Sequence, residues 1–339
     1  MEALATKYRP HVFEDVCGQK SVIAILKRQL ETKEFKNCYL FAGASGCGKT
    51  TLARIFADEI NHHCGSPIEI DGASNNGVDN IRNIIQSASL RAIDAEYKVI
   101  IIDESHMLTQ SSWNALLKTL EEPPKYTIFI FCTTDPQKIP QTILNRLMRF
   151  NLSRLGTDEI TRRLKFICKE ENFANYEEAT DYIAKISNGG MRDAIAMLDK
   201  CSGYSKDLRI DNVLTSLGDF SYSTMFNLTN ALIDGNDKAI VDIVDNVHAS
   251  GNDLKLFASR YVDFVLDLDK YCLFNDISKT KIPSSLTKDV QFATGIQDNT
   301  KYYNWLVDKL LDVRNALKND SSAQTTLTIM LLNIARGVK

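Results

Sequence analysis

Residues 43–50 read GASGCGKT and match the pattern G-x-x-x-x-G-K-[ST] at every defined position. An apolar run, 39–42, precedes this stretch, and a helical pattern carrying Leu52, Ile55 and Phe56 follows it. A strand, a glycine-rich loop and a helix in this order are the setting in which the pattern binds nucleotide phosphates. The stretch therefore predicts a P-loop inside an α/β domain.

The chemistry of phosphate binding explains the residue types in this loop. Its glycines let the backbone curl so that N–H groups point at phosphate oxygens, and the helix N-terminus adds its positive end. Lys49 then reaches the β- and γ-phosphates of ATP, and the Thr50 hydroxyl ligates Mg²⁺. The residues expected around the phosphates are Gly43, Ala44, Ser45, Gly46, Cys47, Gly48, Lys49, Thr50 and Thr51.

A second motif predicts that the bound nucleotide is hydrolysed. Residues 99–106 read VIIIDESH, in which four apolar residues predict a buried strand whose carboxyl end presents Asp103 and Glu104. Asp103 is placed to hold Mg²⁺ through water, and Glu104 to orient and deprotonate the attacking water. A protein that only bound a nucleotide would not need Glu104.

The next apolar run, 126–132, ends in Thr133, Thr134 and Asp135 and leaves two interpretations open. A hydroxyl at the end of a neighbouring strand could hydrogen-bond the γ-phosphate or the attacking water. Equally, it could cap a turn.

The alternation of short apolar runs with helical patterns predicts the fold class. Runs at 38–42, 68–70, 99–102 and 126–132 are separated by helices, which indicates buried parallel strands in a sheet covered on both faces. Strand patterns fade from about residue 155, and after 205 the spacing of apolar residues is helical throughout. We predict three domains: an α/β domain over 1–154, a small helical domain over 155–204 and an all-α domain over 205–339.

The composition is that of a soluble globular protein. The 339 residues are 44% hydrophobic and 24% charged, with a net charge of −3. The chain has no apolar run of about 18 residues, so we expect no membrane span. The first residues, MEALATKYRP, lack the apolar segment of a secretory signal, and the eight cysteines contain no CxxC pair. We therefore expect a cytoplasmic protein with reduced thiols.

Longer segments carry a family resemblance: DGASNNGVDNIR at 71–82, YKVIIIDESHML at 97–108, NALLKTLEEPP at 114–124 and TTDPQKIPQTIL at 133–144. Together with KYRPHVFEDVCGQ at 7–19, they resemble the gamma/tau subunits of bacterial DNA polymerase III. The resemblance is dense over 5–200. It implies an AAA+ ATPase that drives the loading of sliding clamps, with a helical lid over 155–204 and a collar for oligomerisation over 205–339.

The resemblance also assigns residues to the nucleotide site. It implies that Tyr8, Arg9, Pro10 and Val16 border the adenine pocket. Thr134 matches the family's sensor on the strand between the two nucleotide motifs. Arg192, within GGMRDAIAML, matches the sensor arginine that touches the γ-phosphate in the same subunit.

Three residues match family positions at or near the template backbone. Lys118 is expected to project away from the apolar face of its helix, and Lys138 follows Pro136 and Gln137 in a loop. By similarity, Thr142 lies near the same backbone. Contacts of this kind are independent of base sequence and sensitive to salt. Without the resemblance, each lysine is an ordinary surface residue.

Two arginines in ILNRLMRF, residues 143–150, point to a second chain. The family has Ser-Arg-Cys here, with the arginine inserted as a finger into the neighbouring subunit's ATP site, whereas this chain has Asn145-Arg146-Leu147. A finger places positive charge where the transition state spreads negative charge, which can be worth about 10³-fold in rate or more. We assign the finger to Arg146, with Arg149 as the alternative.

The predicted function is that of a clamp-loader motor subunit. Its implied partners are a sliding clamp, primer–template DNA and other loader subunits in a pentameric assembly. Two alternatives remain: a closed-hexamer DNA remodelling motor of the branch-migration type, and a non-hydrolysing assembly subunit of a clamp loader. Bacterial relatives carry a four-cysteine zinc module before the strand at 68–70, but this chain has only NHHCGSP there, so we predict ATP and Mg²⁺ without zinc.

Overall fold

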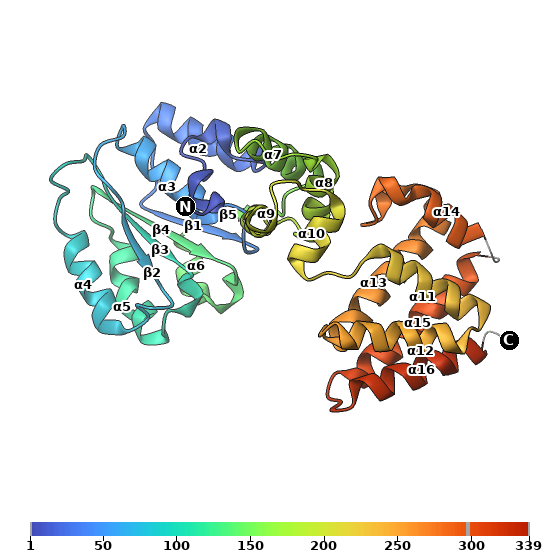
Figure 1. Cartoon of the computed structure of the whole chain (residues 1–339). Helices are drawn as coiled ribbons and strands as arrows, with labels where there is room; N and C mark the ends of the chain where they lie inside the picture. Colours follow the sequence, from blue (N-terminus) through green and yellow to red (C-terminus); the bar gives the residue numbers. More distant parts are fainter. Residues whose placement is uncertain (1, 296–298, 338–339) are drawn as a thin grey trace. The chain divides into compact units, whose positions relative to one another are not determined.

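The computed structural model describes residues 2–295 and 299–337 of the chain. A parallel sheet with helices around it comes first in the chain, and helices alone follow it (Figure 1). The predicted fold class, a P-loop sheet domain followed by helical regions, is confirmed. None of the helices in the described ranges is both long and apolar enough to cross a membrane.

The sheet has the strand order β2-β3-β4-β1-β5, and every neighbouring pair is parallel. Its strands are β1 (Cys38–Gly43), β2 (Ile68–Asp71), β3 (Lys98–Asp103), β4 (Thr127–Thr133) and β5 (Met148–Leu152). The first four match the predicted apolar runs. The prediction that these runs are all buried is wrong for β2, because β2 is an edge strand and Ile68 is 38% exposed. β5 forms the other edge and was not among the predicted strands.

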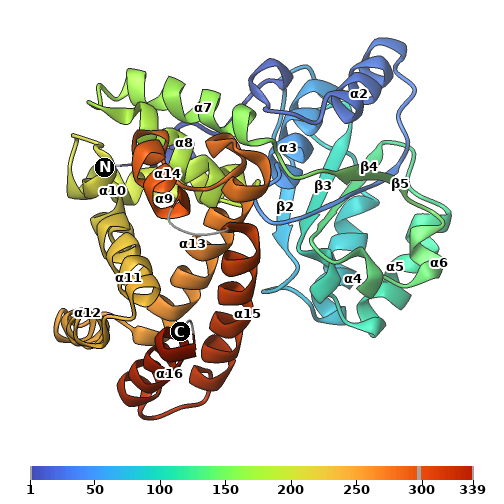
Figure 2. The same ribbon diagram turned by 90° about the vertical axis from the view of Figure 1, so that its right-hand side faces the viewer.

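Helices cover the two faces of the sheet because successive side chains of each strand point to opposite sides. The helices and turns in this part are α1 (Leu4–Lys7), η1 (Phe13–Asp15), α2 (Lys20–Thr32), α3 (Lys49–Ile60), α4 (Val78–Ala88), η2 (Ser105–Met107), α5 (Gln110–Glu121), η3 (Pro136–Lys138) and α6 (Gln141–Leu144). Helices α2 and α3 pack on the face that carries Tyr39 and Phe41. Helices α4, α5 and α6 pack on the face that carries Leu40 and Phe129 (Figure 2).

The later helices are α7 (Thr157–Glu170), α8 (Tyr176–Ile186), α9 (Met191–Tyr204), α10 (Ile210–Leu217), α11 (Tyr222–Asp234), α12 (Asp237–Ala249), α13 (Leu254–Phe274), α14 (Thr287–Gly295), α15 (Asn299–Leu317) and α16 (Ala323–Gly337), with short turns η4 (Ile277–Lys279) and η5 (Ser284–Leu286). Helix α13 is capped at its start by Asp253, whose carboxylate accepts hydrogen bonds from two backbone N–H groups, and at its end by Asn275 in the left-handed conformation. Helix α15 has an apolar stripe with the helical spacing predicted after residue 205, and the stripe is buried: Leu306, Leu310, Val313 and Leu317.

The chain forms two compact units. One contains the sheet, the chain up to Ile167 and Ser187–Asp199, and the other contains Cys168–Ile186 and the chain from Lys200 onward. Most of α7 and the start of α9 therefore belong to the unit of the sheet. In the second unit, α13 and α15 lie side by side and share one apolar core with α11, α12 and α16.

Candidate nucleotide site

The loop after β1 has the backbone of a phosphate cradle. Gly48, the residue before α3, has φ 101°, and Gly46 has φ 71°, so both occupy the left-handed region that favours glycine. A side chain on Gly46 would also meet the backbone of Gly190 at 3.1 Å. The backbone N–H of Met191 donates to the carbonyl oxygen of Gly46 at 3.0 Å, so α9 begins directly against the loop.

Lys49 is a buried cation that has no carboxylate partner in the described part of the chain. Its side chain is only 6% exposed, and its ammonium donates to the carbonyl oxygens of Gly43 and Ala44 at 3.1 and 3.0 Å. A buried charge without an opposite charge is costly, so an anion beside it stabilises the site. This cradle therefore fits the phosphates of a nucleotide.

Lys49→Ala is expected to remove tight ATP binding, because the substitution deletes the only charged group of the loop itself. The backbone cradle remains, so we expect a loss of affinity of about 10²-fold or more, since a buried charge pair broken on one side costs about 3–5 kcal/mol. Equilibrium binding of a fluorescent ATP analogue measures this loss of affinity. Lys20→Ala, at the exposed start of α2, is the control. Retention of tight binding in Lys49→Ala contradicts the assignment.

The start of α3 and the end of β3 bring together the two residues predicted to hold Mg²⁺. The Thr50 hydroxyl donates to Oδ2 of Asp103 at 2.7 Å, and Oδ1 of Asp103 accepts from the backbone N–H of Glu104 at 2.9 Å. A hydroxyl and a carboxylate are oxygen donors of the kind that Mg²⁺ prefers. Among the described residues, no group of three or more His, Cys, Asp or Glu side chains is arranged to hold a metal ion.

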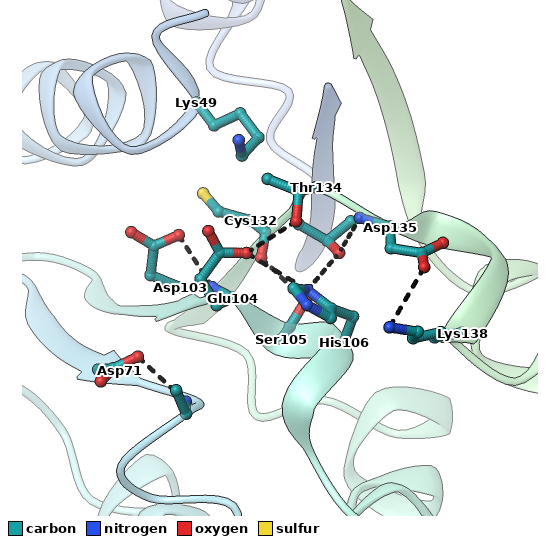
Figure 3. Close-up of polar contacts among 12 residues, drawn as sticks. Lys49, Asp71, Asp103, Glu104, Ser105, His106, Cys132, Thr134, Asp135 and Lys138 are labelled. Atoms are coloured by element: carbon teal, nitrogen blue, oxygen red, sulfur yellow. Dashed lines mark hydrogen bonds and ion pairs between the residues drawn. The ribbon is translucent and has the colours of Figure 1, made fainter. Parts of the chain in front are cut away.

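Glu104 and Thr134 meet at the carboxyl edge of the sheet, at the ends of the adjacent strands β3 and β4 (Figure 3). The Thr134 hydroxyl donates to Oε2 of Glu104 at 3.2 Å. Glu104 has φ 43° and ψ 42°, a left-handed conformation that is uncommon outside glycine. Both interpretations of residues 133–135 find a contact: the Thr134 hydroxyl meets Glu104, whereas the Thr133 hydroxyl accepts from the backbone N–H of Asp135 at 3.0 Å, as a turn cap does.

A single pocket is lined by most of the predicted nucleotide-site residues. From the N-terminal segment it takes Tyr8, Arg9, Pro10 and Val16, and from the motifs Ser45, Gly46, Cys47, Gly48, Lys49, Thr50, Thr51, Asp103, Glu104 and Arg192. Gly43 and Ala44 lie at the start of the loop and Thr134 behind Glu104, and these three do not line the pocket. Segments that are far apart in the sequence therefore converge around the P-loop.

Four cationic side chains line the pocket beside the carboxylates of Asp103 and Glu104: Arg9, Lys49, Arg163 and Arg192. Burial, and then the neighbouring charges of Arg54 and Arg192, lower the pKa of Arg9. Arg54 itself is paired with Glu69 through two hydrogen bonds of 2.7 and 2.6 Å, whereas Arg9 and Arg192 face each other's charge within the site. Guanidinium groups that repel one another in this way favour a bound polyanion.

The sequence analysis missed two residues that hold this pocket together. Gln19 is 8% exposed, and its amide donates to the carbonyl oxygens of Ser153 at 2.8 Å and Cys47 at 3.4 Å, which ties the P-loop to the end of β5. Arg163 of α7 donates to the carbonyl oxygen of Tyr8 at 2.9 Å and holds the N-terminal segment over the pocket. The hydrogen-bond partners Ser153 and Tyr8 lie 134 and 155 residues away from Gln19 and Arg163 in the sequence, so no local pattern indicates these contacts. Gln19 does lie inside the quoted segment 7–19.

The predicted DNA contacts lie outside the pocket. Lys118 on α5 and Thr142 on α6 are exposed, and these two helices pack on the same face of the sheet. Lys138, at the end of η3, is also exposed, and its ammonium lies 3.5 Å from the carboxylate of Asp135. An exposed pair of this kind contributes little stability, so Lys138 is available to a phosphate.

Arg146 and Arg149 lie towards the amino ends of the parallel strands (the amino edge of the sheet), away from the P-loop at their carboxyl ends. Strand β5 is parallel to β1, with Met148 opposite Tyr39 and Leu152 opposite Gly43. At about 3.3 Å per residue, the length of β5 separates Arg146 from the loop by about 15–20 Å. Arg146 is paired with Glu121 and donates to the carbonyl oxygen of Thr142, while Arg149 donates to Asn151 at 2.8 Å.

Comparisons with known proteins show what the chain is similar to. Residues 67–156 match the family model described as DNA polymerase III, delta subunit, and residues 159–206 match the model of the DNA polymerase III clamp loader subunit, ATPase lid domain. DNA polymerase III subunit gamma of Buchnera aphidicola subsp. Schizaphis graminum is 31% identical over 336 residues, which is 91% of each chain. Subunit gamma of Buchnera aphidicola subsp. Acyrthosiphon pisum is 33% identical over 272 residues, which is 74% of this chain and 75% of that protein.

Other relatives are longer than this chain. DNA polymerase III subunit tau of Bacillus subtilis is 38% identical over 274 residues, 74% of this chain and 49% of that protein. The chain thus spans less than half the length of the tau relatives it matches. Among solved structures, the RuvB Holliday junction branch migration motor of Thermotoga maritima has a TM-score of 0.53 and 20% identity, and covers 73% of this chain and 86% of its own. That likeness concerns the AAA+ fold alone.

Proposed function

Because the chain belongs to the gamma/tau family of DNA polymerase III subunits, as the gamma subunits of Buchnera indicate, we propose that it is a clamp-loader motor. It binds and hydrolyses ATP to open a sliding clamp and to place that clamp on primer–template DNA. Its partners are the clamp, the DNA and other loader subunits, and five subunits form the assembly.

The separation of charges across the sheet is the observation that carries this proposal. The cradle, the Mg²⁺-binding residues and Glu104 gather at the carboxyl edge, whereas Arg146 lies at the amino edge. No single arginine side chain spans that distance. A chain that uses Arg146 in catalysis must therefore offer it to another chain's nucleotide, which makes assembly a condition of full activity.

In this proposal, the steps of ATP hydrolysis are assigned to different residues of the site. Lys49 and the loop N–H groups hold the phosphates, and Arg192 at the second position of α9 faces the γ-phosphate. Thr50 and Asp103, whose side chains are joined by a hydrogen bond of 2.7 Å, would hold Mg²⁺, which would supply positive charge beside the phosphate oxygens. Glu104 takes the proton from the attacking water, and Thr134 holds one oxygen of that carboxylate.

The helical parts have separate tasks in this proposal. The region 155–204 acts as the lid of the nucleotide site, since α9 begins at the P-loop and carries Arg192. The helices of 205–339 form the collar that holds the subunits together. The large shared core of α11–α16 supports a rigid assembly domain there.

Lys118→Ala and Lys138→Ala are each expected to weaken primed-DNA binding about 3- to 10-fold, without a preference for base sequence. Each lost phosphate contact also reduces the slope of log affinity against log salt by about 1. Fluorescence anisotropy at several salt concentrations measures both effects. Lys20→Ala, on the opposite face of the sheet, serves as the control. An unchanged salt slope in both variants removes these lysines from the DNA interface.

The proposal as a whole is tested by ATP hydrolysis titrated with primed DNA and a purified candidate clamp. We expect both additions together to raise the turnover of the assembled particle. Native mass spectrometry counts the subunits: five supports a loader, and six supports the closed-hexamer alternative. A monomer that hydrolyses ATP as fast as the assembly contradicts the proposal, and an assembly that binds but never hydrolyses ATP supports the assembly-subunit alternative.

A further inference from the structure

We infer that His106 is a positioning residue that holds the carboxylate of Glu104 in the orientation needed to activate water. The inference deepens the proposed function, on which it rests, because it concerns the same hydrolytic site. His106 is the last residue of the VIIIDESH segment and lies in η2, to the lower right of the Glu104 carboxylate in Figure 3.

The contacts of Glu104 are divided unequally between its two oxygens. Oε2 lies 3.3 Å from Nδ1 of His106 and 3.2 Å from the hydroxyl of Thr134. For Oε1, no hydrogen bond to another described residue is recorded. One oxygen is therefore anchored from two sides, and the other remains available to accept a proton from water, as a general base requires.

The chemistry of the contact determines the state of the imidazole. An ionised carboxylate offers only lone pairs, so the 3.3 Å contact with Oε2 of Glu104 is attractive when Nδ1 of His106 carries a proton. A ring with its proton on Nε2 alone would turn a lone pair towards that oxygen and release it. The tautomer of His106 thereby decides whether Glu104 is held.

The imidazole itself is fixed by its surroundings. The side chain of His106 is 12% exposed, and Nδ1 lies 3.2 Å from the hydroxyl of Thr133, a fully buried residue of β4. The neighbouring Ser105 is also buried, and its hydroxyl donates to the carbonyl oxygen of Cys132 at 3.0 Å, which fastens η2 to β4. The contact with Thr133 and the burial of the ring limit its rotation, so it loses little freedom when it holds Glu104.

The test compares three substitutions of His106 in the assembled particle. An asparagine amide nitrogen can occupy the place of Nδ1, whereas a glutamine amide nitrogen reaches the place of Nε2. We expect His106→Ala and His106→Gln to lower kcat for ATP by about 10-fold or more, since small misplacements of a catalytic group are costly, and His106→Asn to restore most of it. ATP affinity should stay unchanged in all three. His63→Ala, an exposed histidine paired with Asp58, is the matched control.

A double substitution separates positioning from a purely structural role. If His106 acts through Glu104, adding His106→Ala to Glu104→Gln lowers turnover no further, because the group it positions is already disabled. Wild-type kcat in His106→Ala overturns the inference, as do equal losses in the asparagine and glutamine variants. Normal turnover in Glu104→Gln alone would instead overturn the proposed function, so the two failures are distinguishable.

Discussion

Glu104→Gln is expected to bind ATP with nearly wild-type affinity and to lower its turnover by about 10²-fold or more. The substitution keeps the size and the hydrogen-bonding capacity of the side chain, so Thr134 can still donate to the new amide oxygen. It removes the negative charge that takes the proton of the attacking water. Single-turnover hydrolysis of radiolabelled ATP by the assembled particle, beside equilibrium binding, measures the two effects separately.

The stalled state has a second measurable consequence. An assembly that binds ATP without hydrolysing it should keep clamp and primed DNA together, and co-sedimentation of both with the particle would show this. Asp79→Asn provides a control, because Asp79 is an exposed carboxylate that pairs with Arg82 and not with Glu104. If Glu104→Gln hydrolysed ATP at the wild-type rate, Glu104 would not be the base.

Arg146→Ala is expected to spare ATP affinity and to lower turnover of the assembly by about 10³-fold, the lower end of what an arginine finger contributes. Arg146 lies at the edge of the sheet opposite to its own P-loop, so the loss falls on the site of a neighbouring chain. Arg146→Lys should restore little, because lysine has no planar fork for two phosphate oxygens. Steady-state ATP hydrolysis by assembled particles compares the turnover of the wild type, Arg146→Ala and Arg146→Lys.

Mixing two inactive variants tests the direction of this contribution. In an assembly of Arg146→Ala and Glu104→Gln chains, a seam with Glu104 from one chain and Arg146 from the other is intact. Recovery of turnover on mixing therefore indicates action between chains, while action within one chain predicts none. Arg149→Ala is the matched comparison, since Arg149 is exposed on the edge strand β5, three residues after Arg146. A defect in Arg149→Ala without one in Arg146→Ala moves the finger to Arg149.

The strands show how much of the sheet can be predicted from local sequence patterns. Four apolar runs predicted β1, β2, β3 and β4, since a continuous run in an α/β pattern indicates a strand. The sequence could not predict that β2 is exposed. Whether a strand lies at the edge of a sheet depends on strand order and not on the residues of that strand. Strand β5 has the sequence MRFNL, whose alternation fits an edge strand with one buried face, but five residues with an arginine and an asparagine make a weak signal.

The sequence alone determined the phosphate cradle and the acidic strand end, because both are built from consecutive residues whose backbone geometry places the groups. Tertiary structure decided what those groups meet. It put Thr134 and His106 against one oxygen of Glu104, drew Arg163 to Tyr8, and set Arg146 on the far edge of the sheet. Strand order differs from chain order, and side chains brought together across the fold leave no spacing in the sequence by which to find them.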